Sequence, residues 1–216
     1  MSASGRPPST KRAFDVIVGG ALLVVSLPVM LIVAALVRAG LGTPVLFRQT
    51  RPGLGGRPFE LLKFRTMSDA KGAGGQLLPD ADRMTPLGRW LRRSSLDEIP
   101  ELINVVRGDM SLVGPRPLLM QYLARYTPRQ ARRHEMPPGI TGLAQVSGRN
   151  RLSWEDRFEM DIWYVDHWSL AVDLRILFRT AMKVIVGDGI SQPGHETAAE
   201  FQGTQQPPAR PHTGEA

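Results

Sequence analysis

The most promising residues for chemistry are two adjacent carboxylates, Asp97 and Glu98, which follow a basic run at residues 89–93 that includes Arg92. Adjacent carboxylates repel each other, so they favour a bound divalent cation or a raised pKa. A carboxylate can also act as a nucleophile at phosphorus, as it does in enzymes that form an aspartyl-phosphate. The pair is therefore a candidate centre for phosphoryl chemistry.

The same pair also has a purely structural explanation. Ser95 and Glu98 have the spacing of a capping box, and carboxylates are favoured in the first turn of a helix. Pro100 lacks an amide hydrogen and belongs in a first turn as well. Taken alone, this stretch is better explained as the start of a helix, so a functional interpretation depends on its neighbours.

Three further stretches carry basic residues in settings that suit anions. Arg116 lies between two prolines that restrict its backbone, and arginine is the preferred bidentate partner of phosphate oxygens. Lys63 lies beside a glycine-containing turn, and Arg149 follows the glycine-rich run at residues 139–148. Neither of the standard glycine-rich phosphate-binding motifs is present. Each stretch alone is also compatible with a solvated basic side chain.

These residues need a scaffold, and one part of it is an apolar segment near the N-terminus. Residues 16–37 contain no charged side chain, and about 20 apolar residues suffice to cross a bilayer. Pro28 removes a backbone donor and predicts a kink, and Ser26 could satisfy a carbonyl freed there. A cleaved signal peptide and a buried soluble helix both fit this segment poorly.

Basic residues flank the apolar segment on both sides. They are Arg6, Lys11 and Arg12 before it, and Arg38, Arg48, Arg51 and Arg57 after it. Positive flanks favour the cytoplasmic side of a membrane. A straight span would send one basic flank outward, whereas a kinked helix that re-enters keeps both inside. The charge pattern therefore favours a re-entrant helix over a single span.

The composition agrees with a membrane protein that handles anions. The formal net charge of +7 predicts polyanionic partners, namely nucleic acid, anionic lipid or phosphorylated substrates. The chain has no cysteine and four histidines, which excludes disulfides and thiolate metal sites and disfavours a histidine-rich zinc site. A hard cation held by carboxylates stays open.

The rest of the chain predicts helices, one hairpin and several loops rich in glycine and proline. We expect a β-hairpin from the runs at residues 45–51 and 58–67, helices at 87–96, 97–108, 118–133 and in two stretches of 154–186, and loops at 67–84 and 136–150. Trp163, Tyr164 and Trp168 fit a membrane interface and ordinary core packing equally well.

Together these segments resemble the bacterial sugar transferases, the monotopic polyprenyl-phosphate phosphoglycosyl transferases. The similarity covers residues 11–189 and is carried by KRAFDVIVGG from residue 11, FRQTRPGLGGRPFELLKFRTM from residue 47, LRRSSLDEIPELINVVRGDMSLVGPRPLL from residue 91 and PGITGLAQVSGRNRLSWEDRFEMDIWYV from residue 138. The shorter stretch GHETAAEF, at residues 194–201, resembles the small members that act on UDP-diacetylated bacillosamine.

The resemblance implies an α/β, helix-dominated fold with a Pro-kinked re-entrant helix, amphipathic interfacial helices and a small β-hairpin or sheet. Four regions follow: a disordered N-terminus at 1–10, the membrane helix at 11–40, the catalytic domain at 41–190 and a mobile tail at 191–216. The family motif places serine directly before proline, whereas a leucine separates Ser26 from Pro28 here.

The resemblance also implies a reaction at the cytoplasmic face of the bacterial inner membrane. A UDP-sugar gives its phosphosugar to undecaprenyl phosphate by a ping-pong route, with Mg²⁺ as the cofactor and UMP as the by-product. Asp97 matches the family's nucleophile, Glu98 its metal-binding partner, and Arg116 its phosphate-contacting arginine. Four other residues match motif positions associated with substrate or phosphate binding: Lys63, Arg92, Arg149 and Asp161.

Two other functions compete with this interpretation. The positive charge would suit a membrane-anchored nucleic-acid-binding protein, but no motif that reads nucleic acid is present. An inactive scaffold in a glycan-assembly complex would not need an intact Asp97, Glu98 and Arg116. Membrane lipid is an expected partner, nucleic acid is not, and the identity of the sugar and homo-oligomerisation stay open.

Overall fold

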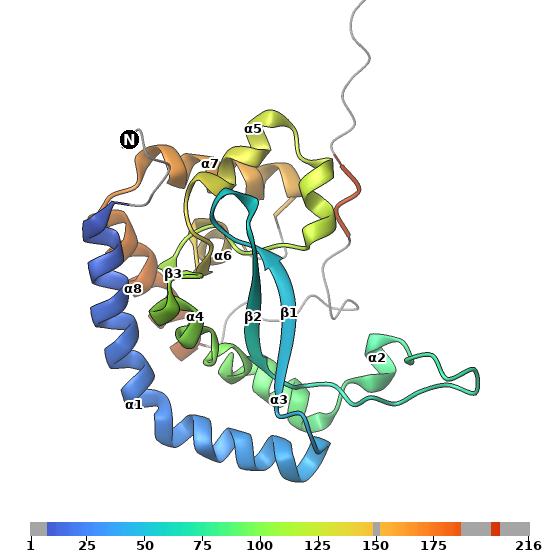
Figure 1. Ribbon diagram of the computed structural model, residues 1–216. Helices are drawn as coiled ribbons and strands as arrows, with labels where there is room; N and C mark the ends of the chain where they lie inside the picture. The colour runs from blue at the N-terminus through green and yellow to red at the C-terminus, as the bar shows by residue number, and fades with distance from the viewer. Residues whose placement is uncertain (1–7, 149–151, 187–199, 204–216) are drawn as a thin grey trace, which may run out of the picture.

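The computed structural model describes residues 8–148, 152–186 and 200–203. Within these ranges helices dominate and two two-stranded sheets are present, which confirms the helix-rich α/β class. Figure 1 shows the long helix α1 along one side of the body and then beneath it, with the β1–β2 hairpin standing in the middle. Arg149 and most of the stretch 194–201 fall outside the described residues.

Helix α1 spans Ser9–Leu41 and is bent (Figure 1). Pro28 lies inside it, and a proline both lacks the amide hydrogen and crowds the preceding turn, so it accounts for the bend. The Ser26 hydroxyl donates to the Leu23 carbonyl at 3.0 Å. It therefore does not satisfy the carbonyl of Val24, which is four residues before the proline.

The two ends of α1 are buried and its middle is not. Lys11 and Asp15 are buried near the start, and Val33 and Val37 are buried near the end. Gly19 allows close packing on the following body, because a β-carbon there would lie 2.9 Å from a methyl of Val105. Between these ends the helix exposes large apolar side chains, namely Leu22, Val24, Val25, Leu27, Val29, Leu31 and Ile32.

The predicted hairpin is confirmed. Strand β1 (Leu46–Pro52) pairs antiparallel with β2 (Pro58–Phe64), and the short 3₁₀ turn η1 (Leu54–Gly56) joins them. Gly55 and Gly56 have φ of 62° and 75°, a conformation that glycine adopts at little cost. Asn104 fastens β2 to the next layer, since its side chain accepts from the Leu62 amide at 3.1 Å and donates to the Glu60 carbonyl at 2.7 Å.

The stretch after the hairpin forms a loop and two helices as expected, but the predicted start of the second helix differs. The loop at 67–84 contains the single turn α2 (Asp80–Arg83), and helices α3 (Pro86–Arg93) and α4 (Glu101–Arg107) follow. Gly108 ends α4 with a φ of 98°. The expected capping box at Ser95 is wrong: Ser95 has a φ of 57°, its side chain caps nothing, and Asp97 and Glu98 lie in the 3₁₀ turn η2 (Leu96–Glu98).

A second sheet was not predicted. Strand β3 (Ser111–Val113) pairs in parallel with β4 (Gly139–Thr141), which lies within the stretch 136–150 that was predicted to be a loop. The close approach explains the glycines, because a β-carbon on Gly114 would lie 2.3 Å from the Pro137 carbonyl. The region 118–133, expected to be a basic helix interrupted at Thr127-Pro128, forms three short turns: η3 (Met120–Arg125), α5 (Pro128–Ala131) and η4 (Arg132–Glu135). Helix α6 (Leu143–Ser147) follows after β4.

Two long helices close the body, as predicted: α7 (Trp154–His167) and α8 (Leu170–Val186). The three aromatic residues of this region differ in burial. Tyr164 is 1% exposed in the core and Trp168 is partly buried, whereas Trp163 is 45% exposed. Phe201 is buried in an aromatic cluster with Tyr122, Tyr126, Trp154 and Phe158.

Candidate active site

Glu98 is the hub of the candidate site, because two cations from distant parts of the chain share one of its oxygens. The Lys63 ammonium lies 2.5 Å from Glu98 Oε1 and the Arg116 Nη2 lies 2.6 Å from the same atom. Burial alone would raise the pKa of Glu98, but the charges of Arg116 and Lys63 outweigh it and hold that pKa well below its usual range. Glu98 is therefore a permanent carboxylate committed to two partners.

Asp97 has the opposite character. Its side chain is buried, and within the described part of the chain no hydrogen bond or ion pair holds its carboxylate. Burial and the neighbouring charge of Glu98 raise the pKa of Asp97 to about 6, although Lys63, Arg92 and Arg116 act against this. Asp97 is thus ionised at neutral pH without being neutralised by a direct partner, which suits a nucleophile.

The raised pKa of Asp97 predicts a pH-dependent cost in stability. The pKa of Asp97 in the folded protein exceeds the ordinary 3.8, so ionising Asp97 lowers the free energy of unfolding. This loss is absent below about pH 4, grows as the pH rises to about 6, and reaches about 3 kcal/mol above that. We expect Asp97→Asn to unfold at a higher temperature than the native protein at pH 8, with the gap closing near pH 4. Thermal unfolding in detergent with a chelator present measures this.

The matched control for that experiment is Asp82→Asn, at an exposed position on α2. It should leave the unfolding temperature unchanged at both pH values. An Asp97→Asn variant that is less stable than the native protein at pH 8 would show that the folded state favours the charged carboxylate, contrary to the burial seen here.

Glu101 is a third carboxylate of the site, and sequence reasoning missed it. It lies 3.1 Å from Lys63 through its Oε1, is 2% exposed, and has its pKa raised to about 7 by burial and by the charge of Glu98. It is the first residue of α4, so it was hidden among ordinary helix-start acids. Its spacing of three residues from Glu98 was the only available signal.

The remaining predicted residues lie at different distances from this hub. Arg92 Nε donates to Thr66 Oγ1 at 3.2 Å, and its charge is close enough to lower the pKa of Asp97. Asp161 is buried in α7 and pairs with Arg133 at 2.7 Å, so the structure does not place it on the carboxylate hub. Ser26 and Pro28 lie in the exposed middle of α1.

The donor set fits a hard divalent cation. Asp97 and Glu98 offer carboxylate oxygens, the ligands that Mg²⁺ prefers, and Mg²⁺ sites commonly combine one or two carboxylates with substrate phosphates and water. No cluster of three or more metal-binding side chains occurs among residues 8–148, 152–186 and 200–203. A cation here would therefore need phosphate oxygens from a substrate to complete its shell.

Comparison with known proteins identifies the family of this chain. A profile described as bacterial sugar transferase matches residues 7–187. The uncharacterized sugar transferase EpsL of Bacillus subtilis is 55% identical over 90% of this chain and 96% of its own length. A UDP-glucose:undecaprenyl-phosphate glucose-1-phosphate transferase of Caulobacter vibrioides is 42% identical over 82% of this chain and 70% of its own.

A third relative is much longer than the region it shares. The undecaprenyl-phosphate galactose phosphotransferase of Salmonella typhimurium is 37% identical over 83% of this chain, which corresponds to 41% of its own length. The shared region is the one that contains Lys63, the carboxylates and Arg116. With the profile matched over most of its length, the chain belongs to the bacterial sugar transferase family and is an enzyme of the phosphoglycosyl transferase class.

Proposed function

We propose that this enzyme transfers a phosphosugar from a UDP-sugar to undecaprenyl phosphate. The observation that carries the proposal is the contrast between the two adjacent carboxylates: Asp97 has no direct partner among the described residues, whereas Glu98 is held by Lys63 and Arg116. The relatives named above support the lipid acceptor, since two of them carry undecaprenyl phosphate in their names.

The transfer proceeds in two displacements. In the first, an Asp97 oxygen attacks the β-phosphorus of the UDP-sugar, the bond to the bridging oxygen breaks, and UMP leaves with that oxygen and its electron pair. In the second, a phosphate oxygen of undecaprenyl phosphate attacks the same phosphorus and releases the Asp97 carboxylate. Arg116 and Lys63 supply fixed positive charge beside the oxygens on which negative charge collects.

Mg²⁺ is the cofactor we propose for this site, held by Glu98 and Asp97. When bound, the ion would neutralise the diphosphate and make UMP a better leaving group. Lys63 has a second carboxylate, Glu101, within reach at 3.1 Å. The Lys63 ammonium therefore keeps a carboxylate partner if Glu98 binds Mg²⁺.

A UMP-release assay tests the proposed function directly. The native protein in detergent or nanodiscs is incubated with Mg²⁺, undecaprenyl phosphate and each of a panel of UDP-sugars, including UDP-glucose, UDP-galactose, UDP-N-acetylglucosamine and UDP-diacetylbacillosamine. We expect UMP and a lipid-linked diphosphosugar from at least one donor. UMP release from none of them would overturn the proposal, and salt-sensitive DNA binding in its place would favour the nucleic-acid alternative.

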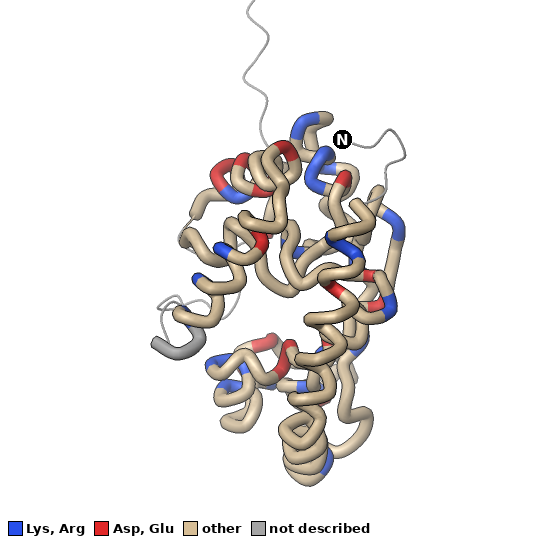
Figure 2. The backbone as a smooth tube through the Cα atoms, turned by 90° about the vertical axis from the view of Figure 1, so that its left-hand side faces the viewer, with Lys and Arg blue, Asp and Glu red and all other residues tan. Residues whose placement is uncertain are grey.

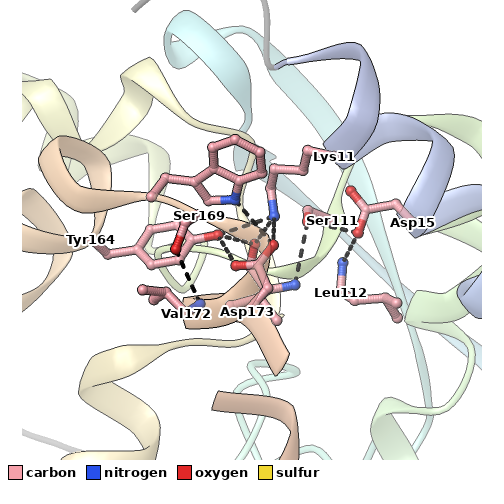
Figure 3. Close-up of polar contacts among 10 residues, drawn as sticks. Lys11, Asp15, Ser111, Leu112, Tyr164, Ser169, Val172 and Asp173 are labelled. Atoms are coloured by element: carbon pink, nitrogen blue, oxygen red, sulfur yellow. Dashed lines mark hydrogen bonds and ion pairs between the residues drawn. The ribbon is translucent and has the colours of Figure 1, made fainter. Parts of the chain in front are cut away.

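We also propose that α1 enters the cytoplasmic leaflet and returns to the same side. The first turns of α1 are fixed to the body, because Lys11 contacts Asp173 at 2.7 Å and Asp15 accepts from the Leu112 amide at 3.0 Å (Figure 3). The last turn is fixed to the same body, since Arg65 donates to the Leu41 carbonyl at 2.6 Å. A helix with both ends on one body does not place them on opposite sides of a bilayer.

The apolar middle of α1 then faces lipid, and Figure 2 shows that stretch free of charged residues. Helix α8 offers a second apolar surface. Leu170, Leu174, Phe178 and Met182 recur every four residues, so they line one face of α8, and all four are exposed. We propose that this face lies at the membrane interface beside α1.

Cysteine labelling tests the topology. The native chain has no cysteine, so Thr10→Cys and Arg48→Cys each introduce one exposed thiol on either side of the apolar segment. We expect a membrane-impermeant maleimide to label both in inverted membrane vesicles and neither in intact spheroplasts. The control Ala21→Cys, inside the apolar segment, should react in neither preparation. Labelling of one position from each side would overturn re-entry and establish a single span.

A further inference from the structure

A buried ion pair formed by Arg133 and Asp161 contacts the backbone of the candidate site at Arg116. Arg133 is 2% exposed, and its Nε and Nη2 lie 3.0 and 2.7 Å from Asp161 Oδ2. The same Nη2 donates to the backbone carbonyl of Arg116 at 2.7 Å, and Nη1 donates to the Tyr126 hydroxyl at 3.3 Å. All three guanidinium nitrogens are therefore engaged, and one of them reaches the backbone of a proposed phosphate-binding residue.

The backbone around Arg116 has few other ways to be fixed. Pro115 and Pro117 flank it and have no amide hydrogen to donate. Strand β4 holds the incoming side of the turn, because the Gly139 amide donates to the Pro115 carbonyl at 3.0 Å. The hydrogen bond from Arg133 to the Arg116 carbonyl holds the turn at the residue whose side chain reaches Glu98.

Stability is a poor explanation for this pair. A buried ion pair loses about as much in desolvation as it gains in attraction, and apolar replacements of similar volume are often neutral or stabilising. Arg133 and Asp161 sit against an aromatic cluster that would accept apolar side chains, since Arg133 lies over the rings of Tyr126 and Phe158. Their geometry toward Arg116 offers a better reason for their presence.

We propose that Arg133 is a positioning residue for Arg116, and that Asp161 acts through Arg133. The chain of contacts runs from Asp161 on α7 to Arg133, to the Arg116 carbonyl, and through the Arg116 side chain to Glu98. Asp161 then contributes to the site without contacting phosphate. The expected effect on UMP release rests on the proposed function. The expected loosening of the backbone at Arg116 rests on the geometry alone.

Arg133→Lys tests the proposal and has a matched control. Lysine keeps the charge opposite Asp161 but cannot bridge to a second acceptor with the same planar fork. The neighbouring pair Arg132–Asp166 joins the same two elements, η4 and α7, at 2.5 Å. It is partly exposed, and within the described part of the chain no contact links it to Arg116. Arg132→Lys therefore makes the same chemical change on the same elements without reaching the site.

The first measurement is hydrogen–deuterium exchange of the peptide covering residues 111–119, which needs no turnover. We expect this peptide to exchange faster in Arg133→Lys and in Asp161→Asn than in Arg132→Lys. The comparison is made between variants that unfold at the same temperature. Unchanged exchange in both variants would overturn the proposal whether or not the enzyme releases UMP. If Asp161→Asn fails to fold, Arg133→Lys still decides the question.

The second measurement is a double-mutant cycle on UMP release. Small misplacement of a binding group can cost about 100-fold in rate, so we expect Arg133→Lys to lower kcat/KM by about 10- to 100-fold. In an Arg116→Ala background the same change should cost less than about 2-fold, because the group it positions is gone. Equal losses in the two backgrounds would mean that Arg133 acts elsewhere. If the native protein itself releases no UMP, the proposed function is refuted, and the result of the exchange experiment still holds.

Discussion

Asp97→Asn is expected to lower UMP release by at least about 10³-fold, the scale on which removing a covalent nucleophile acts. Asparagine has nearly the same shape but cannot carry the negative charge that the attack requires. The structure adds a reason why no other group replaces it. Glu98 is held by two cations, Glu101 is 2% exposed beside Lys63, and both are therefore poorly placed to attack.

The decisive measurement is covalent labelling without the lipid acceptor. A UDP-sugar radiolabelled in the sugar should transfer its label to the native protein and release UMP once per active site. Asp97→Asn should take up no label at any time, while the control Asp82→Asn should label as the native protein does. Label found on Glu98 or Glu101 by peptide mapping would contradict the assignment, as would full labelling of the Asp97→Asn variant.

The sequence predicted the parts of the fold that depend on local patterns. The bent helix follows from an apolar run with Pro28 inside it, and the hairpin follows from two runs around a glycine turn. The pair β3–β4 was missed because three-residue strands between glycines and prolines carry no periodic pattern. Their pairing depends on close backbone approach at Gly114, which only the folded chain reveals.

The sequence also predicted the main residues of the candidate site, but not the buried residue that contacts the Arg116 backbone. Asp97, Glu98, Lys63 and Arg116 were expected to act together, and the structure places the last three within hydrogen-bond distance. Arg133 was not expected, since one arginine in a basic turn looks like its neighbours, the exposed Arg129 and the partly exposed Arg132. What separates it is burial and a partner 28 residues away, neither of which a local pattern records.

Glu98→Gln is expected to lower UMP release by about 10²- to 10³-fold, the scale of losing one preorganised electrostatic group in a site. The change removes the charge that Lys63 and Arg116 share at 2.5 and 2.6 Å, so both cations lose the carboxylate that fixes them beside the proposed phosphate position. It also removes a proposed ligand of Mg²⁺. Glutamine keeps the size of the side chain, so packing is retained.

Glu60→Gln is the control for this change, because the Glu60 side chain pairs with Arg48 at the exposed surface of the hairpin and contacts none of the site residues that the structure describes. Surface pairs of this kind contribute little, so activity should stay within about 2-fold of the native value.

Time courses of covalent labelling then separate the roles of the two adjacent carboxylates. If Asp97 is the nucleophile and Glu98 holds the cations, Glu98→Gln should label slowly and still reach the native stoichiometry at Asp97, whereas Asp97→Asn should never label. If Glu98→Gln needs a higher Mg²⁺ concentration than the native protein for half-maximal labelling, Glu98 is a ligand of the ion. Complete loss of labelling in Glu98→Gln, with partial labelling in Asp97→Asn, would reverse the assignment, because only the nucleophile is indispensable for forming the intermediate.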